Sequence, residues 1–410
     1  MNLKNQQSFR EPDRKLELNT FFGGGFECST FRRRSGLRVD LIASTSHDRF
    51  AQQDYQRLAK QGLRWAREGV RWHLVEAIPG HYNFSSLIPI VRAAQSTGTQ
   101  VIWDLCHFGW PEHLDIFQPD FVPALAEAGC AFAQWLANET GSPGHFVPVN
   151  EISYFSWASG DEGSMFPFVT GRGFELKAQL VRAAIETMKA IWGVCPDSRF
   201  VHVDPIIHVI NSPRRPEERA AAEAYRQSQF QAFDMLAGRV WPELGGQEKF
   251  LDVIGVNFYP QNQWFYNLKG FQKVRRFSPI RRTNPLYRPF REMLQEVYAR
   301  YHRPMIVSET GAEDRARPGW LRYVCQESEA AIQEGVPLHG MCLYPILNHP
   351  GWADDRHCHN ALWDYPDKHG DRKIYAPLAA ELRRWRKVFD ADRATNEMNT
   401  NPHTELVSSG

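Results

Sequence analysis

The chain has 410 residues and a formal net charge of +1, with 48 Lys and Arg against 47 Asp and Glu. Hydrophobic residues make up 42% of it and charged residues 23%, which is typical of a globular protein and too apolar for a disordered one. This near-balance of charge argues against nucleic acid as a partner, because phosphate binding is driven by a surplus of basic residues.

Several features bear on the compartment. The longest apolar stretch, 121–137, is interrupted by Glu127 and Gln134 and is typical of an amphipathic helix and not of a membrane span. The first fifteen residues contain no apolar segment of the kind that a signal peptide needs. The seven cysteines show no CxxC spacing, which favours reduced thiols. We therefore expect a cytoplasmic protein with no membrane partner.

Short strand-like runs recur along the chain and alternate with amphipathic, helix-like patterns. In chain order, the predicted strands are 21–26, 63–68, 101–107, 146–151, 199–204, 251–259, 304–309 and 340–344. The predicted helices are 49–61, 123–138, 174–192, 216–237, 288–301, 320–334 and 377–388.

This alternation predicts parallel βαβ units. Eight strands over this length predict a single-domain α/β protein, a (β/α)8 TIM barrel with enlarged βα loops. We assign the barrel to 21–390, after an N-terminal extension (1–20) and before a polar tail (391–410) that we expect to be disordered. A doubly wound open sheet is the alternative, but the glycines at 23–25 are not followed by a helix-like segment, as a dinucleotide-binding motif requires.

Most of the predicted strands end in a polar or aromatic residue, and the carboxyl ends of barrel strands line the active sites of such proteins. Two of these residues are glutamates: Glu151 ends the fourth strand and Glu309 the seventh. Across an eight-stranded barrel, the two side chains would enter one cleft from opposite sides. Glycoside hydrolysis needs such a pair, one as general acid and one on the other face of the sugar. Two surface acids in ordinary salt bridges are the alternative.

Six motifs give the chain a resemblance to glycoside hydrolase family 1, the β-glucosidase-like family. Pro148–Ile152 (PVNEI) resembles the family's T-F-N-E-P segment, and Val307–Gly311 (VSETG) resembles its I-T-E-N-G segment. His107–Pro111 (HFGWP) matches H-W-D-L-P, and Gly255–Tyr259 (GVNFY) matches G-x-N-Y-Y. The spacing of Gly62, Arg67 and Trp72 matches the family pattern around strand two, and Tyr344–Ala353 matches its eighth-strand segment. The resemblance spans residues 20–390 and identifies a divergent member or a close sister family.

The resemblance implies a role for each matching residue. Glu151 would be the acid/base of a retaining β-glycosidase and Glu309 its nucleophile, with Arg67 and Tyr259 in contact with the nucleophile. We prefer Arg67 to Arg71 because Arg67 keeps the register of the family pattern. The residues that would bind the sugar or support the site are His107, Asn150, Asn257, Tyr344 and Trp352.

The chain also departs from the family pattern. The family's sugar-binding Glu of strand eight falls on Gly351, its Trp on Tyr344, and its strand-one Gln has no match, since Glu27 and Ser29 are out of register. We expect Gly351 to leave a wider sugar site that tolerates substituents on the outer hydroxyls.

Two further segments carry a notable composition. Asp355–His359 contains His357, Cys358 and His359, but this spacing does not match structural zinc motifs, so we favour a polar active-site loop and expect neither metal nor cofactor. Residues 269–291 hold eight Lys or Arg and no acid; they form either a solvated loop or a contact for an anionic substrate.

The predicted function is hydrolysis of small β-linked glycosides by double displacement. A transglycosylase with the same two glutamates and an inactive sugar-binding barrel remain as alternatives. The sugar, the linkage and the oligomeric state do not follow from the residues.

Overall fold

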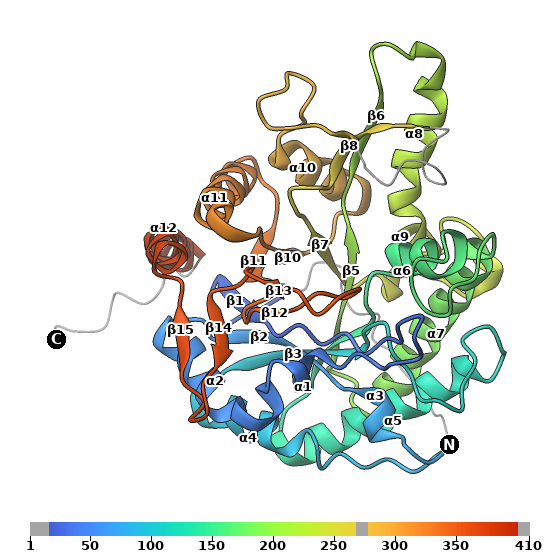
Figure 1. The fold of residues 1–410 in the computed structure, drawn as a ribbon, viewed down its shortest axis with the longest axis vertical. Coiled ribbons are helices and arrows are strands. Elements are labelled where there is room, and N and C mark those ends of the chain that lie inside the picture. The colour runs from blue at the N-terminus through green and yellow to red at the C-terminus, as the bar shows by residue number, and fades with distance from the viewer. Residues whose placement is uncertain (1–15, 268–277, 401–410) are drawn as a thin grey trace, which may run out of the picture.

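Eight parallel strands close into a barrel in the computed structural model, which describes residues 16–267 and 278–400, with side chains as far as Ala391. The barrel lies at the centre of the molecule with helices around it (Figure 1). Around the barrel the strands are β1 (Phe22–Gly25), β2 (Trp65–Gly69), β3 (Gln100–Cys106), β4 (His145–Val149), β5 (Arg199–Pro205), β7 (Val253–Asn257), β10 (Met305–Thr310) and β11 (Leu338–Leu343). This confirms the predicted (β/α)8 TIM barrel and the single domain, and all eight predicted strands overlap these.

Helices connect successive strands on the outside of the barrel. The main ones are α2 (His47–Lys60), α4 (Ile88–Thr97), α5 (Phe121–Thr140), α7 (Gly173–Val194), α8 (Arg219–Gln227), α9 (Gln231–Leu236), α10 (Phe290–Tyr301), α11 (Arg317–Gln333) and α12 (Ala376–Thr400). None of the helices in the described part of the chain combines the length and apolar character that a membrane span requires.

Three helical predictions need correction. Helix α4 was not predicted, because its Ile-Pro-Ile-Val start is as apolar as a strand; a proline at its first turn and Gly98 in the left-handed conformation after its end delimit it. The predicted helix 216–237 is divided by a 3₁₀ turn at Ser228–Phe230 into α8 and α9. Helix α12 continues to Thr400, so the first ten residues of the predicted tail extend this helix; residues 401–410 lie outside the described part.

The barrel interior is a separate, mainly apolar core, which extends from Leu16 and Leu18 before β1 to Tyr344 after β11. Alternate residues of a strand point inwards, so Val201 and Val203 of β5 face the interior while Phe200 packs under the helices. The glycines of β1 make room for large interior rings. A Cβ on Gly23 would lie 2.3 Å from Trp65, and one on Gly25 would lie 2.0 Å from Tyr344. The glycine cluster at 23–25 therefore serves packing.

Short strands and loops at the carboxyl ends of the barrel strands build the rim. Strands β6 (His208–Asn211), β8 (Gln263–Tyr266) and β9 (Ser278–Pro279) form a small sheet that projects from the barrel together with α8 (Figure 1). After β11, the chain forms a β12–β13 pair (His349–Pro350 and His357–Cys358) and a β14–β15 pair (Trp363–Pro366 and Arg372–Ile374). These segments are the enlarged loops that the sequence predicted.

A buried ion pair ties the last of these hairpins to the first large helix. Arg372 of β15 donates to both carboxylate oxygens of Asp54 on α2, at 2.7 and 2.9 Å, and to the carbonyl of Thr45 at 2.8 Å. The side chains of Arg372 and Asp54 are 0% exposed. The pair joins segments more than 300 residues apart, close to the point where the barrel closes.

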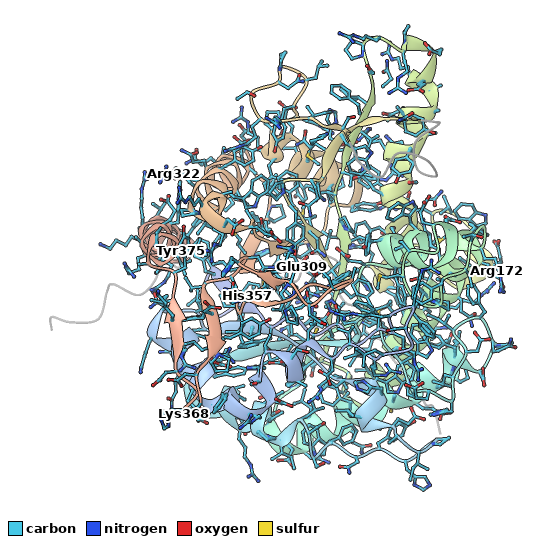
Figure 2. The ribbon with its side chains drawn as sticks, in the orientation of Figure 1. Arg172, Glu309, Arg322, His357, Lys368 and Tyr375 are labelled. Atoms are coloured by element: carbon cyan, nitrogen blue, oxygen red, sulfur yellow. The ribbon has the colours of Figure 1, made fainter. Side chains whose placement is uncertain are left out.

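We expect Arg372→Ala to destabilise the protein by about 1.5–3 kcal/mol, because it removes buried hydrogen bonds to the Asp54 carboxylate, which keeps only Arg57 and His47 as partners. The control is Arg322→Ala, which removes a salt bridge to Glu381 from a side chain that is 48% exposed, at the outer edge of the molecule in Figure 2. Loss of this exposed salt bridge should lower the free energy of unfolding by no more than about 1 kcal/mol. The melting temperature of each variant is measured by calorimetry and compared with that of the wild type. Equal decreases in the two variants would contradict the prediction.

Candidate active site

A cavity of about 850 Å³ opens at the carboxyl ends of the barrel strands. Its volume lies within the range of about 300–1,000 Å³ that is typical of small-molecule sites. The ends of β1, β3, β4, β5, β7, β10 and β11 each contribute a residue to its wall: Glu27, His107, Glu151, Pro205, Tyr259, Glu309 and Tyr344. Its outer part is lined by Tyr154, Trp157, Asp161, Phe174, Lys177, Tyr225, Gln229, Gln231, Trp264 and Trp352, among others.

Glu309 is the last but one residue of β10 and lies near the middle of the molecule in Figure 2. The register of β10 against β7 shifts between Val307 and Glu309, and such irregularities re-aim side chains at a strand end. One carboxylate oxygen accepts a hydrogen bond from Arg67 Nη1 at 2.7 Å, and the other accepts from the hydroxyl of Tyr259 at 2.8 Å. Both oxygens of Glu309 are therefore held by donors that favour the ionised carboxylate.

Glu151 follows β4 and adopts a left-handed backbone conformation, with φ 48° and ψ 58°. This conformation costs a non-glycine residue about 1–3 kcal/mol and persists only where the surroundings enforce it. Here the Glu151 amide donates to the carbonyl of Val203 at 3.1 Å. Its Oε1 accepts from Asn257 Nδ2 at 2.7 Å, while Asn257 Oδ1 accepts from Ser308 Oγ at 2.6 Å. The serine thereby fixes the orientation of the amide that holds Glu151.

The two carboxyl groups differ in the charges around them. Burial, and next the nearby Glu309 carboxylate, raise the pKa of Glu151 well above its usual range, with only the Asn257 hydrogen bond and Arg67 acting in the opposite direction. Burial also raises the pKa of Glu309, but Arg67, His107 and Tyr259 all oppose that rise. As the pH increases, Glu309 is therefore the first of the two to lose its proton, and Glu151 keeps its own.

His107 and Asn150 are joined directly to each other. Asn150 Oδ1 accepts from Arg67 Nη2 at 2.9 Å, so its amide nitrogen is the group that donates to His107 Nε2 at 3.1 Å. This pattern assigns the ring proton of a neutral His107 to Nδ1, which lies 3.2 Å from Cys28 Sγ and 3.7 Å from Asp104. Both residues line the cavity, with the imidazole held in one orientation.

Tyr344 and Trp352 supply aromatic surface to the cavity. The ring of Tyr344 lies parallel to the imidazole of His107 at 6.2 Å and 5.2 Å from the Arg67 guanidinium. Trp352, on the loop between β12 and β13, packs against Phe31 and Phe108 with ring centroids 5.4 and 5.5 Å apart. Apolar ring faces of this kind pack against the C–H faces of sugars.

The structure separates the two candidate arginines. Arg67 is fully buried between Asp104 and Glu309, at 2.7 Å from each. Arg71 lies outside the cavity lining and pairs instead with Asp40 and Asp48. Every other residue expected in the site (Glu151, Glu309, His107, Asn150, Asn257, Tyr259, Tyr344 and Trp352) either lines the cavity or, in the case of Asn257, contacts a residue that does.

Among the acidic residues at the strand ends that line the cavity, the comparison of motifs missed Glu27. Glu27 lines the cavity and is 7% exposed, although its position is out of register with the family's strand-one Gln. Strand β1 ends at Gly25, and the loop that follows places Glu27 in the cavity wall beside His107. Its signal was an acid directly after the predicted strand 21–26, close to the position at the end of a predicted strand that identified Glu309.

Gly351 does not widen the cavity. The space that a Cβ would occupy is filled by Asp354, whose Oδ1 lies 2.1 Å from that position, and Gly351 is not among the lining residues. Its carbonyl accepts from Arg33 Nη2 at 3.0 Å. The expectation that this glycine leaves a wider sugar site therefore lacks support in the structure.

The described residues of the two segments of notable composition are not among those that line the cavity. His357 pairs with Asp364 at 2.8 Å and stacks on His359, and this exposed trio has its ligand atoms close enough to hold a metal ion. Cys28, Asp104 and His107 form a second group with such spacing, but there Asp104 is already paired with Arg67. Of the basic segment 269–291, residues 269–277 lie outside the described part, and Arg288 and Arg291 pair with acids of α10 and α11.

Comparison with known proteins identifies the fold. No family model and no curated protein matches the chain. Among solved structures, the family 1 β-glucosidase from Thermotoga maritima matches with a TM-score of 0.74 at 16% identity, over 92% of this chain and 99% of that one. The same enzyme in complex with deoxynojirimycin matches with a TM-score of 0.72 at 16% identity, over 90% and 98%. The AHE enzyme from Alicyclobacillus herbarius matches with a TM-score of 0.72 at 13% identity, over 92% and 100%. The chain thus has the fold of family 1 β-glucosidases over nearly its whole described length.

Proposed function

We propose that the protein is a retaining β-glycosidase that hydrolyses small β-linked glycosides. The observation that carries this proposal is the pair of glutamates in one cavity, each with a different set of partners. Glu309 has two donors on its carboxylate, while Glu151 has one amide donor and two acids nearby, Glu309 and Asp204. Two carboxyl groups whose environments separate their pKa values are the usual sign of an acid and a nucleophile.

The chemistry follows from these protonation states. Ionised Glu309 attacks the anomeric carbon while Glu151 gives its proton to the departing oxygen, which leaves a sugar bonded to Glu309. Glu151, now ionised, takes a proton from water as the water attacks the same carbon, and Glu309 departs as a carboxylate. Two inversions at one carbon retain the β configuration.

The supporting residues have distinct parts in this proposal. Arg67 and Tyr259 keep Glu309 ionised and oriented, and Asn257 orients Glu151. Asn150 and His107 present polar atoms to the sugar hydroxyls, and Trp352 packs on its ring. The likeness to enzymes that bind deoxynojirimycin and other sugar-shaped inhibitors supports a small carbohydrate as the ligand. The complete set of contacts at both glutamates favours activity over an inactive sugar-binding barrel.

The first prediction separates the two glutamates. Glu151→Ala should retain substantial activity on dinitrophenyl glycosides, whose leaving group needs no proton, and lose roughly 10²–10⁴-fold on alkyl glycosides. Glu309→Ala should lose nearly all activity on both. Initial rates on the two substrates test this, with Glu313→Ala as a control, since Glu313 pairs with Arg356 at the surface. Equal losses of the two active-site variants on both substrates would reverse or remove the assigned roles.

The second prediction concerns pH. Glu309 must be ionised, so activity falls as the pH drops through its pKa. Tyr259→Phe removes a donor to the carboxylate, which raises that pKa and shifts the acid limb of the kcat/KM profile to higher pH. The lost hydrogen bond to a charged group should also lower kcat/KM roughly tenfold or more. Tyr298→Phe, on α10 and outside the cavity lining, should leave the profile unchanged. An unshifted acid limb in Tyr259→Phe would contradict this account of Glu309.

The third prediction is the configuration of the product. Proton NMR during the first minutes of hydrolysis should show the β anomer of the released sugar, before mutarotation mixes the anomers. An α anomer as the first product would exclude double displacement, even if both glutamates proved essential.

A further inference from the structure

Glu27 is the one carboxylate at the inner end of the cavity that the proposed mechanism leaves without a role. It lines this end with His107 and Tyr344 and is 7% exposed. Its Oε1 accepts two hydrogen bonds from Ser29, from the amide at 3.0 Å and from the hydroxyl at 2.6 Å. Among the residues that the structure describes, no group donates to Oε2. A carboxylate that is positioned through one oxygen and open at the other is suited to accept hydrogen bonds from a ligand.

Glu27 faces the same space as the reacting groups. Its Oε1 lies 3.9 Å from His107 Nε2. Burial and the charges of Glu309 and Glu151 raise the pKa of Tyr259, and the Glu27 carboxylate contributes to the same rise. The hydroxyl of Tyr259 donates to Glu309, so the Glu27 charge acts on the region where the sugar ring must lie for attack by Glu309.

The loop after β11 contributes no carboxylate to the cavity lining, to which it supplies Tyr344 and Trp352. Gly351 has no side chain, and Asp354 fills the space beside it while accepting a hydrogen bond from the Arg356 amide. His349 uses Nδ1 on the Pro350 carbonyl at 2.7 Å and Nε2 on the Asn360 amide at 3.0 Å, and it does not line the cavity. Near His107 and Tyr344, Glu27 is therefore the carboxylate that can accept hydrogen bonds from the outer hydroxyls of the sugar.

The charges at the inner end of the cavity are unfavourable to an anionic sugar. Glu27 and Glu309 carry negative charge there, and the guanidinium of Arg67 is already occupied by Asp104, Glu309 and Asn150. Of the described residues that line the cavity, Lys177 is the only lysine or arginine; it donates to Gln231 and lies beside Asp161 and Asp204. A phosphate or carboxylate on the sugar would meet like charge without a free counter-charge, which costs affinity.

We propose that Glu27 binds the hydroxyls of the cleaved sugar and restricts the site to sugars without an anionic group. This inference rests on the proposed glycosidase function and names its substrate class: β-glycosides of a neutral sugar. Glu27 thus supplies, from the loop after β1, the carboxylate that Gly351 lacks in the loop after β11.

The test compares the wild-type protein with Glu27→Gln on one aryl leaving group attached to glucose, to 6-phosphoglucose and to glucuronic acid. The wild type should prefer the neutral glucoside, and Glu27→Gln should lose roughly 10–100-fold in kcat/KM on it, since charge-assisted hydrogen bonds to the hydroxyls weaken. The preference for glucose over the two anionic sugars should narrow by roughly tenfold or more, because one like charge is removed. An unchanged preference, or a wild type that prefers an anionic sugar, would overturn the proposal.

Two further variants separate a direct contact from general effects. Asp161→Asn removes a negative charge from the outer part of the same cavity and retains an acceptor for the Gly173 amide, so the preference should stay within about threefold of wild type. Ser29→Ala removes the hydroxyl that orients Glu27 and should give a smaller loss than Glu27→Gln on the glucoside. If Asp161→Asn reduces the preference for glucose over the anionic sugars as much as Glu27→Gln does, the effect comes from the overall negative charge of the cavity. The assignment to Glu27 then fails.

A binding measurement distinguishes failure of this inference from failure of the proposed function. Deoxynojirimycin is a sugar-shaped amine, and calorimetry measures its affinity without turnover. It should bind the wild type and bind Glu27→Gln roughly tenfold or more weakly. Hydrolysis of the glucoside with equal affinity in the two proteins would overturn the role of Glu27 alone. Binding without hydrolysis of any glycoside would overturn the proposed function while retaining Glu27, and neither binding nor hydrolysis would overturn both. Equal melting temperatures of wild type and variant exclude misfolding as the cause.

Discussion

The guanidinium of Arg67 is the interaction on which the geometry of the site depends. A guanidinium has five N–H donors, and each has an acceptor here. Nε and Nη2 donate to the two oxygens of Asp104, Nη2 also to Asn150, and Nη1 to the Ser308 carbonyl and to Glu309. These acceptors belong to β3, β4 and β10, so one planar group from β2 fixes the carboxyl ends of strands around half of the barrel. A lysine at this position would supply three donors from a single nitrogen and could not hold all of them.

The same group explains why the two glutamates are not equivalent. Taking Arg67 with Asp104 and Glu309 leaves a buried cluster with one net negative charge, and Glu151 lies close enough for Glu309 to raise its pKa. A second carboxylate charge beside this cluster would be repelled at low dielectric, so Glu151 keeps its proton. The asymmetry does not come from the glutamates, which are both buried at the ends of barrel strands. The difference between their pKa values arises because Arg67 pairs with Glu309 and not with Glu151.

The sequence predicted the framework far better than the rim, for a physical reason. Barrel strands are buried on both faces and alternate with amphipathic helices, so β7 and β10 are visible in the sequence as apolar runs. A residue at the end of such a run must lie at the mouth of the barrel. Helix α4 was missed because its first four residues are as apolar as a strand. Glu27 was missed because the loop after Gly25 has no periodicity, and only its contacts with Ser29 and His107 indicate its position. The filling of the space beside Gly351 by Asp354 likewise depends on how a loop closes on itself.

This division between strands and loops also bears on how far the likeness to family 1 β-glucosidases extends. The residues around Glu151 and Glu309 are held by strand register and by Arg67, so their positions depend on the barrel itself, which is what the likeness at 16% identity shows. The residues that select the sugar lie on loops, where a carboxylate can be lost at one strand end and gained at another without disturbing the barrel core. Glu27 is anchored by a serine two residues away on its own loop, not by the barrel network. With the role proposed for Glu27, substrate choice would be set by contacts local to a loop, and it could change while the proposed chemistry at the two glutamates stays the same.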